Sequence, residues 1–197
     1  NGVDEANRLT IRGLRVENDN QNGHGISLGD QNHVALENLT ITNVQGHGVH
    51  VNHSASSNDL LFDLLTVNAA DGQSDFRVSS DADVDGLQLT NSTFTGGGLG
   101  INIVNTGGGD DNVKNATFDN LTFNDQSTDS FTGKDGSRGI FIEKLSNASF
   151  SDIVINAPSG SDAEFTRAFQ LNLKGNAFED ISVDGLEING FDTPQAS

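Results

Sequence analysis

Residues 32–41 read NHVALENLTI, and residues 58–67 read NDLLFDLLTV. In each stretch apolar residues recur at alternate positions, the alternation changes phase at position 38 or 64, and it then resumes. Alternation with a period of two residues is typical of a β-strand. Each stretch is therefore predicted to contain two short strands that meet at a bend.

This pattern recurs along the chain in seven copies. Successive copies start 25 residues apart at the closest, from Asn7 to Asn32, and 32 apart at the widest, from Lys114 to Ser146. Most bends fall on Gly, Asn or Asp, which tolerate the left-handed backbone of a tight corner, and stacked Asn side chains there are expected to form a hydrogen-bonded ladder. The predicted bend residues are Gly13, Asn38, Leu64, Asn91, Asn120, Asp152 and Asp180.

A third strand is predicted in six of the copies, where an apolar-any-apolar triplet follows the first two strands. The triplets are bounded by Ile26/Leu28, Val49/Val51, Phe76/Val78, Ile101/Ile103, Ile140/Ile142 and Phe169/Leu171. In the last copy, Leu186/Ile188 follows Val183 too closely to be an equivalent third strand without a shortened loop. Three short strands per turn, with equivalent positions in register, predict a parallel β-solenoid whose coils stack about 4.8 Å apart.

The same register predicts the core. Equivalent apolar residues of successive coils are expected to stack as internal columns, so a chain with 34% hydrophobic residues can still bury a continuous core. One predicted column comprises Leu36, Phe62, Leu89, Phe118, Phe150 and Phe178, and a second comprises Ile41, Val67, Phe94, Phe123 and Ile155. An antiparallel sandwich would need two-residue hairpin turns and would not keep this long-range register.

The pattern Asn-x-h-x-h-x-Asn-h-x-h followed by Gly-h-x-h, where h is an apolar residue, resembles the right-handed parallel β-helix superfamily. That superfamily includes pectate lyases, polygalacturonases, alginate epimerases, phage tailspikes and surface adhesins. The resemblance covers residues 7–190 and implies an all-β, right-handed parallel β-helix with three short strands per coil and about seven coils. It also implies that residues 1–197 form one domain, a module of a larger extracellular protein. It does not specify an activity, because this architecture carries many.

Charge and composition narrow the function. The chain has 28 acidic and 10 basic residues, for a net charge of −18, which disfavours nucleic-acid binding, repels anionic membranes and attracts calcium. No apolar run is long enough to cross a membrane, so membrane insertion is not expected. Cysteine is absent, which excludes disulfides, thiolate metal sites and cysteine nucleophiles. An acidic, cysteine-free repeat protein suits export, so we expect an extracellular or cell-surface location.

A catalytic alternative centres on residues 23–27, Gly-His-Gly-Ile-Ser. They resemble the Gly-His-Gly element of polygalacturonase-like glycoside hydrolases, with His24 as the matching histidine. That family also carries Asn-Thr-Asp and Asp-Asp motifs upstream of this element and an Arg-Ile-Lys motif downstream of it, which this sequence lacks at those places, and hydrolysis needs paired carboxylates at the glycosidic bond. Arg77 beside Asp75 is the nearest imitation of a calcium-dependent lyase site. We assign no catalytic residue and interpret the glycines as a turn into the third strand; a lyase, hydrolase or epimerase for pectate or alginate stays the alternative.

Histidine and arginine gather at the outward positions of the third strand and at the positions two residues before it. The candidate ligand-binding residues are His24, His47, His50, Arg77, Asn102, Arg138, Phe141 and Arg167. A basic stripe on an acidic rod suits an anionic or hydroxylated polymer, such as a polysaccharide or cell-surface glycan. The competing interpretation is that one charged residue per coil only solvates the surface, and that Phe141 packs under a loop instead of stacking on a sugar.

Asp110 and Asp111 are candidate calcium ligands, because adjacent carboxylates supply the hard oxygen atoms that calcium prefers. A plain turn is the alternative, since calcium β-rolls repeat a nine-residue unit many times and this stretch occurs once. We thus predict a non-catalytic scaffold, with a carbohydrate- or partner-binding face used in adhesion. A third hypothesis is end-to-end self-association into a stacked assembly, because residues 1–6 and 190–197 are short for capping the terminal coils.

Overall fold

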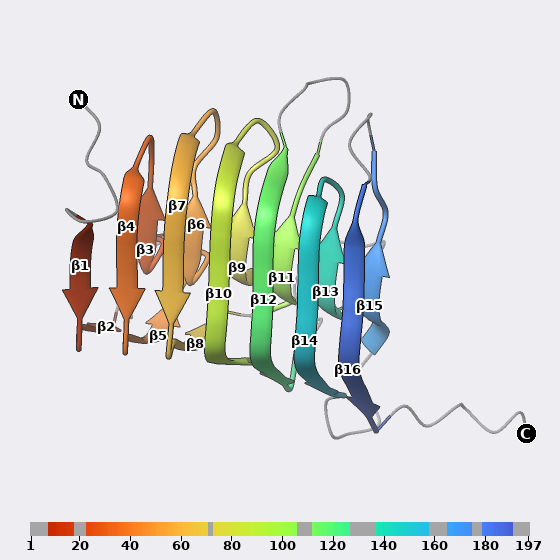
Figure 1. Cartoon of the computed structure of the whole chain (residues 1–197). Coiled ribbons are helices and arrows are strands. Elements are labelled where there is room, and N and C mark those ends of the chain that lie inside the picture. Colours follow the sequence, from red (N-terminus) through yellow and green to blue (C-terminus); the bar gives the residue numbers. More distant parts are fainter. Residues whose placement is uncertain are drawn as a thin grey trace, which may run out of the picture.

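The computed structural model describes residues 8–17, 23–70, 73–105, 112–126, 137–157, 165–174 and 179–190. The regular secondary structure of these residues is entirely β-strand, and they contain no helix long and apolar enough to cross a membrane. The strands pair in parallel and form two sheets (Figure 1). The all-β parallel solenoid predicted from the repeat is confirmed.

Sheet A runs through the first strand of each coil in the order β1-β4-β7-β10-β12-β14-β16, with β2, β5 and β8 beside it. Figure 1 shows these strands side by side, with β1 and β16 at opposite ends of the row. The bounds are β1 (Leu9–Arg12), β2 (Arg15–Glu17), β4 (Asn32–Glu37), β5 (Thr40–Val44), β7 (Ser56–Asp63), β8 (Thr66–Ala69), β10 (Asp83–Thr95), β12 (Val113–Asn124), β14 (Ser146–Asn156) and β16 (Ile181–Asn189).

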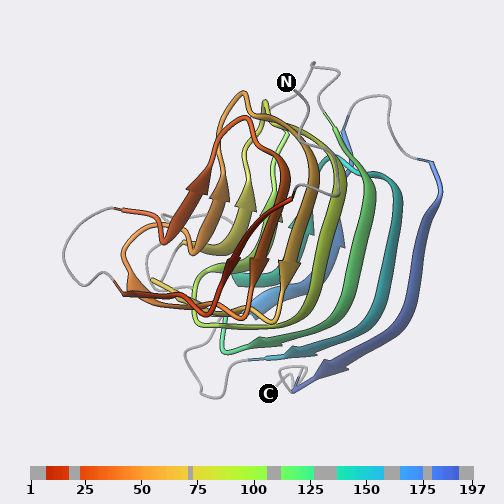
Figure 2. The same ribbon diagram turned by 60° about the vertical axis from the view of Figure 1, so that its left-hand side comes forward.

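Sheet B lies behind sheet A in Figure 1 and holds the predicted third strands, in the order β15-β13-β11-β9-β6-β3. The turned view in Figure 2 shows successive coils wrapping around a common interior. The bounds are β3 (Ile26–Leu28), β6 (Val49–Val51), β9 (Ser74–Val78), β11 (Leu99–Ile103), β13 (Ser137–Ile142) and β15 (Phe165–Leu171).

The predicted bends have left-handed backbone geometry. Asn38, Asn91 and Asn120 have φ of 53°, 49° and 51°, and Leu64 has 55°. In the first three coils the bend separates two strands, whereas β10, β12, β14 and β16 continue through it as single bent strands. The prediction was therefore right about the corner in each of these coils. The strand is broken at the corner only in the first three coils.

The last coil was predicted in the wrong register. Val183 pairs with Phe150, so it, and not Phe178, continues that column; Phe178 itself lies outside the described residues. The corner of this coil is Gly185, with φ of 69°, and not Asp180. It follows that the pair at 186 and 188 belongs to the second strand segment of the coil.

The error has a physical cause, since every coil from the second to the last has at least two left-handed positions five residues apart. Both columns favour Asn, Asp and Gly for the same steric reason, so either can be taken for the bend when one coil is read alone. From the second coil to the last, the two positions are His33/Asn38, Asp59/Leu64, Gly86/Asn91, Asn115/Asn120, Asn147/Asp152 and Asp180/Gly185.

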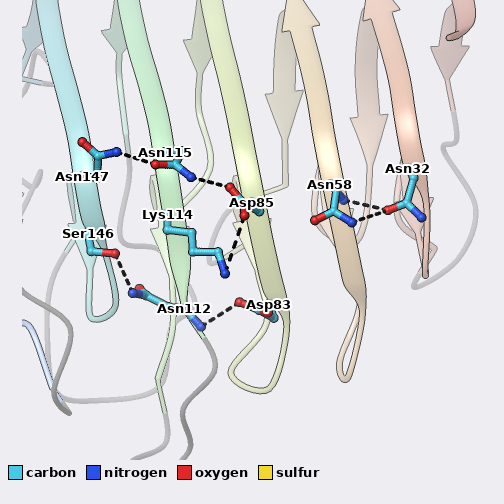
Figure 3. Close-up of polar contacts among 9 residues, drawn as sticks. All are labelled: Asn32, Asn58, Asp83, Asp85, Asn112, Lys114, Asn115, Ser146 and Asn147. Carbon is cyan, nitrogen blue, oxygen red and sulfur yellow. Dashed lines mark hydrogen bonds and ion pairs between the residues drawn. The ribbon is translucent and has the colours of Figure 1, made fainter. Parts of the chain in front are cut away.

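Polar ladders connect the coils outside the core. At the bend, Asn120 Nδ2 donates to Asn91 Oδ1 at 2.8 Å, which confirms the predicted asparagine ladder. Figure 3 shows a second set of ladders near the start of the first strands. There Asn58 Nδ2 donates to Asn32 Oδ1 at 3.0 Å, and Asn115 Nδ2 donates to Asp85 Oδ1 at 2.6 Å. These bonds keep equivalent side chains in register from coil to coil.

The core consists of the predicted columns. Phe118 stacks on Phe150 with ring centroids 4.6 Å apart, and Phe94 stacks on Phe123 at 5.1 Å. All four rings are fully buried. Burial of one such side chain stabilises a fold by roughly 1.5–3 kcal/mol, so columns of them stabilise a thin interior without a helical layer.

Candidate ligand-binding face on sheet B

The structure brings the predicted binding residues into two adjacent columns on sheet B. In the outer column, pairing in register aligns Ser27 with His50, His50 with Arg77, Arg77 with Asn102, and Asn102 with Phe141. In the neighbouring column, Ser74 and Leu99 are followed in register by Arg138 and Arg167. The predicted set therefore occupies one face.

The glycines of the two Gly-His-Gly stretches are required by close packing. A Cβ at Gly48 would lie 2.3 Å from Val67 Cγ1 and 2.5 Å from the backbone oxygen of Asp75, so no larger residue fits there without movement. Gly25 has the same problem against Ile41, at 2.4 Å. These glycines let the chain enter the third strand against the core, which agrees with their structural interpretation.

Three histidines form a compact cluster at the first two coils. The rings of His24 and His47 are stacked, with centroids 5.0 Å apart and planes 3° from parallel, and His50 meets both rings edge-on at 4.3 and 5.2 Å. The backbone N–H of His47 donates to His24 Nδ1, and that of Ser74 donates to His47 Nδ1, each at 3.0 Å. Because Nδ1 accepts in both rings, their neutral form carries its proton on Nε2.

This cluster is uncharged near neutral pH. Burial, together with the positive charge of Arg77 and the two neighbouring rings, lowers the pKa of His47 to about 3. Burial, His24 and Arg77 lower the pKa of His50 to about 4, and burial with Arg77 also lowers the pKa of His24. The three histidines therefore add no charge to the predicted basic stripe, because packed imidazoles lose the water that would stabilise their charge.

Arg77 is the cation of this end of the face. It is half-buried and its pKa is lowered by that burial, yet an arginine keeps its proton at neutral pH. Within the part of the chain that the structure describes, no carboxylate lies within ion-pair distance of it. A partly desolvated guanidinium without an acidic partner is unusual in a chain with 28 acidic residues.

Polar groups beside Arg77 have unused hydrogen-bonding capacity. Among the described residues, His50 Nδ1 and Asn102 Oδ1 are buried without a partner. The other polar atoms of these side chains are used, since His50 Nε2 lies 2.7 Å from Ser79 Oγ and Asn102 Nδ2 donates to Ser74 Oγ at 3.1 Å. Buried polar atoms without partners are few in folded proteins, and these two are too deeply buried to contact a ligand directly.

The far end of the face is built differently. Arg138 is only 5% exposed, and its guanidinium carbon lies 4.3 Å from the ring centroid of Phe141, as in a cation–π pair. Asn102 is only 3% exposed, whereas Arg167 is exposed. Asn102 and Arg138 can therefore position their neighbours but offer little surface to a ligand.

Asp75 has a structural role that the sequence did not reveal. It is fully buried, accepts from the Ala69 backbone N–H at 2.9 Å and from Gln126 Nε2 at 3.2 Å, and burial raises its pKa well above the ordinary value. It is thus not a surface carboxylate partner for Arg77. The burial of Asp75 had one signal in the sequence. The equivalent positions in the adjacent coils are Gly48 and Gly100, where a Cβ would point into the core.

The predicted calcium ligands Asp110 and Asp111 lie outside the described residues. Among the residues that are described, no group of three or more His, Asp or Glu side chains is arranged to hold a metal ion.

Comparison with known proteins gives one match. The sequence model of a family described as a right handed beta helix region matches residues 2–195. No curated protein and no solved structure shows a significant similarity to the chain. The match includes all the strands of both sheets.

Proposed function

We propose that this chain, which belongs to the right-handed β-helix family, is a non-catalytic scaffold whose sheet B face binds an acidic polysaccharide. The observation that carries the proposal is the half-buried Arg77, which has no carboxylate partner among the described residues and is surrounded by neutral histidines. A ligand carboxylate would complete a charge-assisted pair that the protein itself leaves open.

The neutral state of the histidines favours a sugar over a simple anion. Imidazole rings that carry a proton on Nε2 donate to hydroxyl oxygens, and exposed ring surface suits the apolar face of a sugar. His24 is exposed and its Nε2–H can donate to a ligand, whereas Nε2 of His50 is already bonded to Ser79 Oγ. A uronic acid residue, with hydroxyls and one carboxylate, fits this combination.

The repeat extends the site in one direction. Equivalent positions recur once per coil along sheet B, so Phe141 and Arg167 lie farther along the same face as His24 and Arg77. A polymer aligned with the columns would meet a cation near each end. A chain of several sugar residues is therefore expected to bind better than a single one.

The burial of the carboxylate beside Arg77 supports the non-catalytic part of the proposal. Glycoside hydrolysis needs two carboxyl groups on either side of the bond, and the carboxylate nearest in sequence to Arg77, Asp75, is buried and already bonded to Ala69 and Gln126. Release of reducing or unsaturated ends from pectate, polygalacturonate or alginate would overturn this part of the proposal. An extracellular or cell-surface location belongs to the same proposal, since acidic polysaccharides are found there.

The test is calorimetry with oligogalacturonate, and with a neutral oligosaccharide of the same length as a second probe. We expect saturable binding of the acidic probe that Arg77→Gln weakens by about 10- to 100-fold, as for loss of a charge-assisted hydrogen-bonded pair. Lys114→Gln removes the same charge from sheet A, where Lys114 lies 3.6 Å from Asp85, and should leave the affinity unchanged. Equal affinities of wild type and Arg77→Gln, or preference for the neutral probe, would refute the proposal.

A further inference from the structure

The first coil leaves an apolar strand edge open. Among the described residues, β1 pairs with β4 alone and β2 with β5 alone. Leu9 is 56% exposed and Ile11 and Leu14 are also exposed, although the equivalent residues of the second coil, Val34, Leu36 and Leu39, are buried. The internal columns therefore end at this coil without an apolar neighbour among the described residues.

The last coil leaves the matching edge open. Within the described ranges, β16 pairs only with β14. Val183 and Ile188 are each 44% exposed, and they continue the columns of Phe150 and Ile155. The two open edges lie at opposite ends of sheet A (Figure 1), and each offers unpaired backbone groups to another strand.

The two edges carry opposite charges at equivalent positions. Following the register from coil to coil, Arg12 stands in the column that ends at Asp184, and Arg15 stands in the column that ends at Glu187. Arg12 and Arg15 are among only 10 basic residues in the chain. Their side chains are 69% and 68% exposed, so each can reach a further partner beyond Glu37 and Glu17, to which they now bond.

We propose that copies of this chain stack head to tail, with β16 of one copy paired in parallel to β1 and β2 of the next. In this contact β1 and β2 of the next copy take the place of a further coil after β16, in the same register in which β16 follows β14. It places Val183 over Ile11, Asp184 beside Arg12 and Glu187 beside Arg15, so the apolar columns and the charges are matched together. The contact is heterologous and does not close on itself, so it builds linear stacks.

The net charge of −18 sets the conditions for this contact. Copies repel one another at long range, and that repulsion is strongest at low ionic strength. At physiological salt, where the Debye length is about 8 Å, the distant charges are screened while the facing pairs stay in contact. Stacking is therefore expected to be weak in low salt and to strengthen as salt rises toward the physiological range.

The experiment is sedimentation of the whole chain from micromolar to millimolar concentration at physiological salt. Wild type should form concentration-dependent oligomers. Arg15→Glu, which places two acidic residues at the 15/187 contact, and Glu187→Arg, which places two basic residues there, should each stay monomeric alone. An equimolar mixture of the two should form linear stacks in which the two variants alternate, because every joint between unlike copies is then complementary at positions 15 and 187.

This design needs no separate folding control, since an unfolded variant would not restore association in the mixture. Among the described residues Arg15 is bonded only to Glu17, at the surface, so its replacement leaves the core columns intact. A monomeric wild type at all concentrations would overturn the proposal, whether the edges are then covered by the rest of this chain or by another partner. Association of wild type that neither variant reduces, or a mixture that stays monomeric, would also overturn it.

Discussion

Replacing His47 with glutamine should remove a defined part of the acid sensitivity of the fold. The pKa of His47 is about 3 in the folded chain and about 6.5 when it is unfolded. The unfolded state therefore takes up the proton first as pH falls. The stabilising contribution is complete above about pH 6.5 and is lost progressively as pH falls toward 3, at up to about 1.4 kcal/mol per pH unit.

Between pH 7 and pH 5 the calculation for His47 alone gives a loss of about 2 kcal/mol in the free energy of unfolding. This figure depends mainly on the unfolded pKa, because the folded value lies well below 5. Most carboxylates stay ionised in this window, so their contribution is small. The lowered pKa of His50 acts in the same direction, but its more solvated ring is expected to contribute less.

The assay is urea unfolding followed by far-ultraviolet circular dichroism at both pH values, since the chain has no Trp or Tyr for fluorescence. The quantity to compare is the change between pH 7 and pH 5 within each protein, which cancels the pH-independent cost of the substitution. His47→Gln should show a change about 2 kcal/mol smaller than wild type. His53→Gln, on an exposed ring outside the cluster, leaves the cluster intact and should keep its acid sensitivity. An identical change in wild type and His47→Gln would refute the reasoning.

Three further substitutions test the packing. Leu64→Asn should raise the free energy of unfolding by about 1 kcal/mol, because Asn tolerates φ of 55° better than Leu, whereas Leu64→Ala keeps the strain and should not. Asp75→Asn should stabilise the fold at pH 7 and lose that advantage below about pH 4. Because the pKa of Asp75 is raised in the folded state, the wild type loses stability as pH rises above the pKa of the unfolded state, and asparagine does not. A gain in stability that does not depend on pH would contradict this. Gly48→Ala should destabilise by about 1–3 kcal/mol from overpacking, while Gly29→Ala, with open space around its Cβ, should have little effect; melting temperatures that fall equally would contradict the close-packing argument.

The fold was predictable because its information is periodic. The column from Leu36 to Phe150 follows from spacing alone, since parallel coils place equivalent residues over one another. The last coil failed because Asp180 and Gly185 are both left-handed positions with interchangeable residue preferences. Only pairing with β14, a contact that local sequence does not encode, decides between them.

The placement of the candidate residues on one face was predictable, and the charge of the histidines was not. The strand register brings His47, His50 and Arg77 onto one face, as the repeat indicated. The neutral state of the histidines depends on how closely the rings pack, and their spacing in sequence does not report that. The same holds for Arg138, whose burial against Phe141 depends on side-chain packing.

The claim that Arg77 and the histidine cluster bind an acidic glycan is tested most directly by nuclear magnetic resonance during titration with oligogalacturonate. The proposal predicts that the Arg77 Nε–H resonance and the ring resonances of His24 and His50 shift together and saturate. The side-chain amide of Asn115, in the ladder of sheet A, should not move. Unchanged Arg77 and histidine resonances at a concentration that saturates binding elsewhere would contradict it.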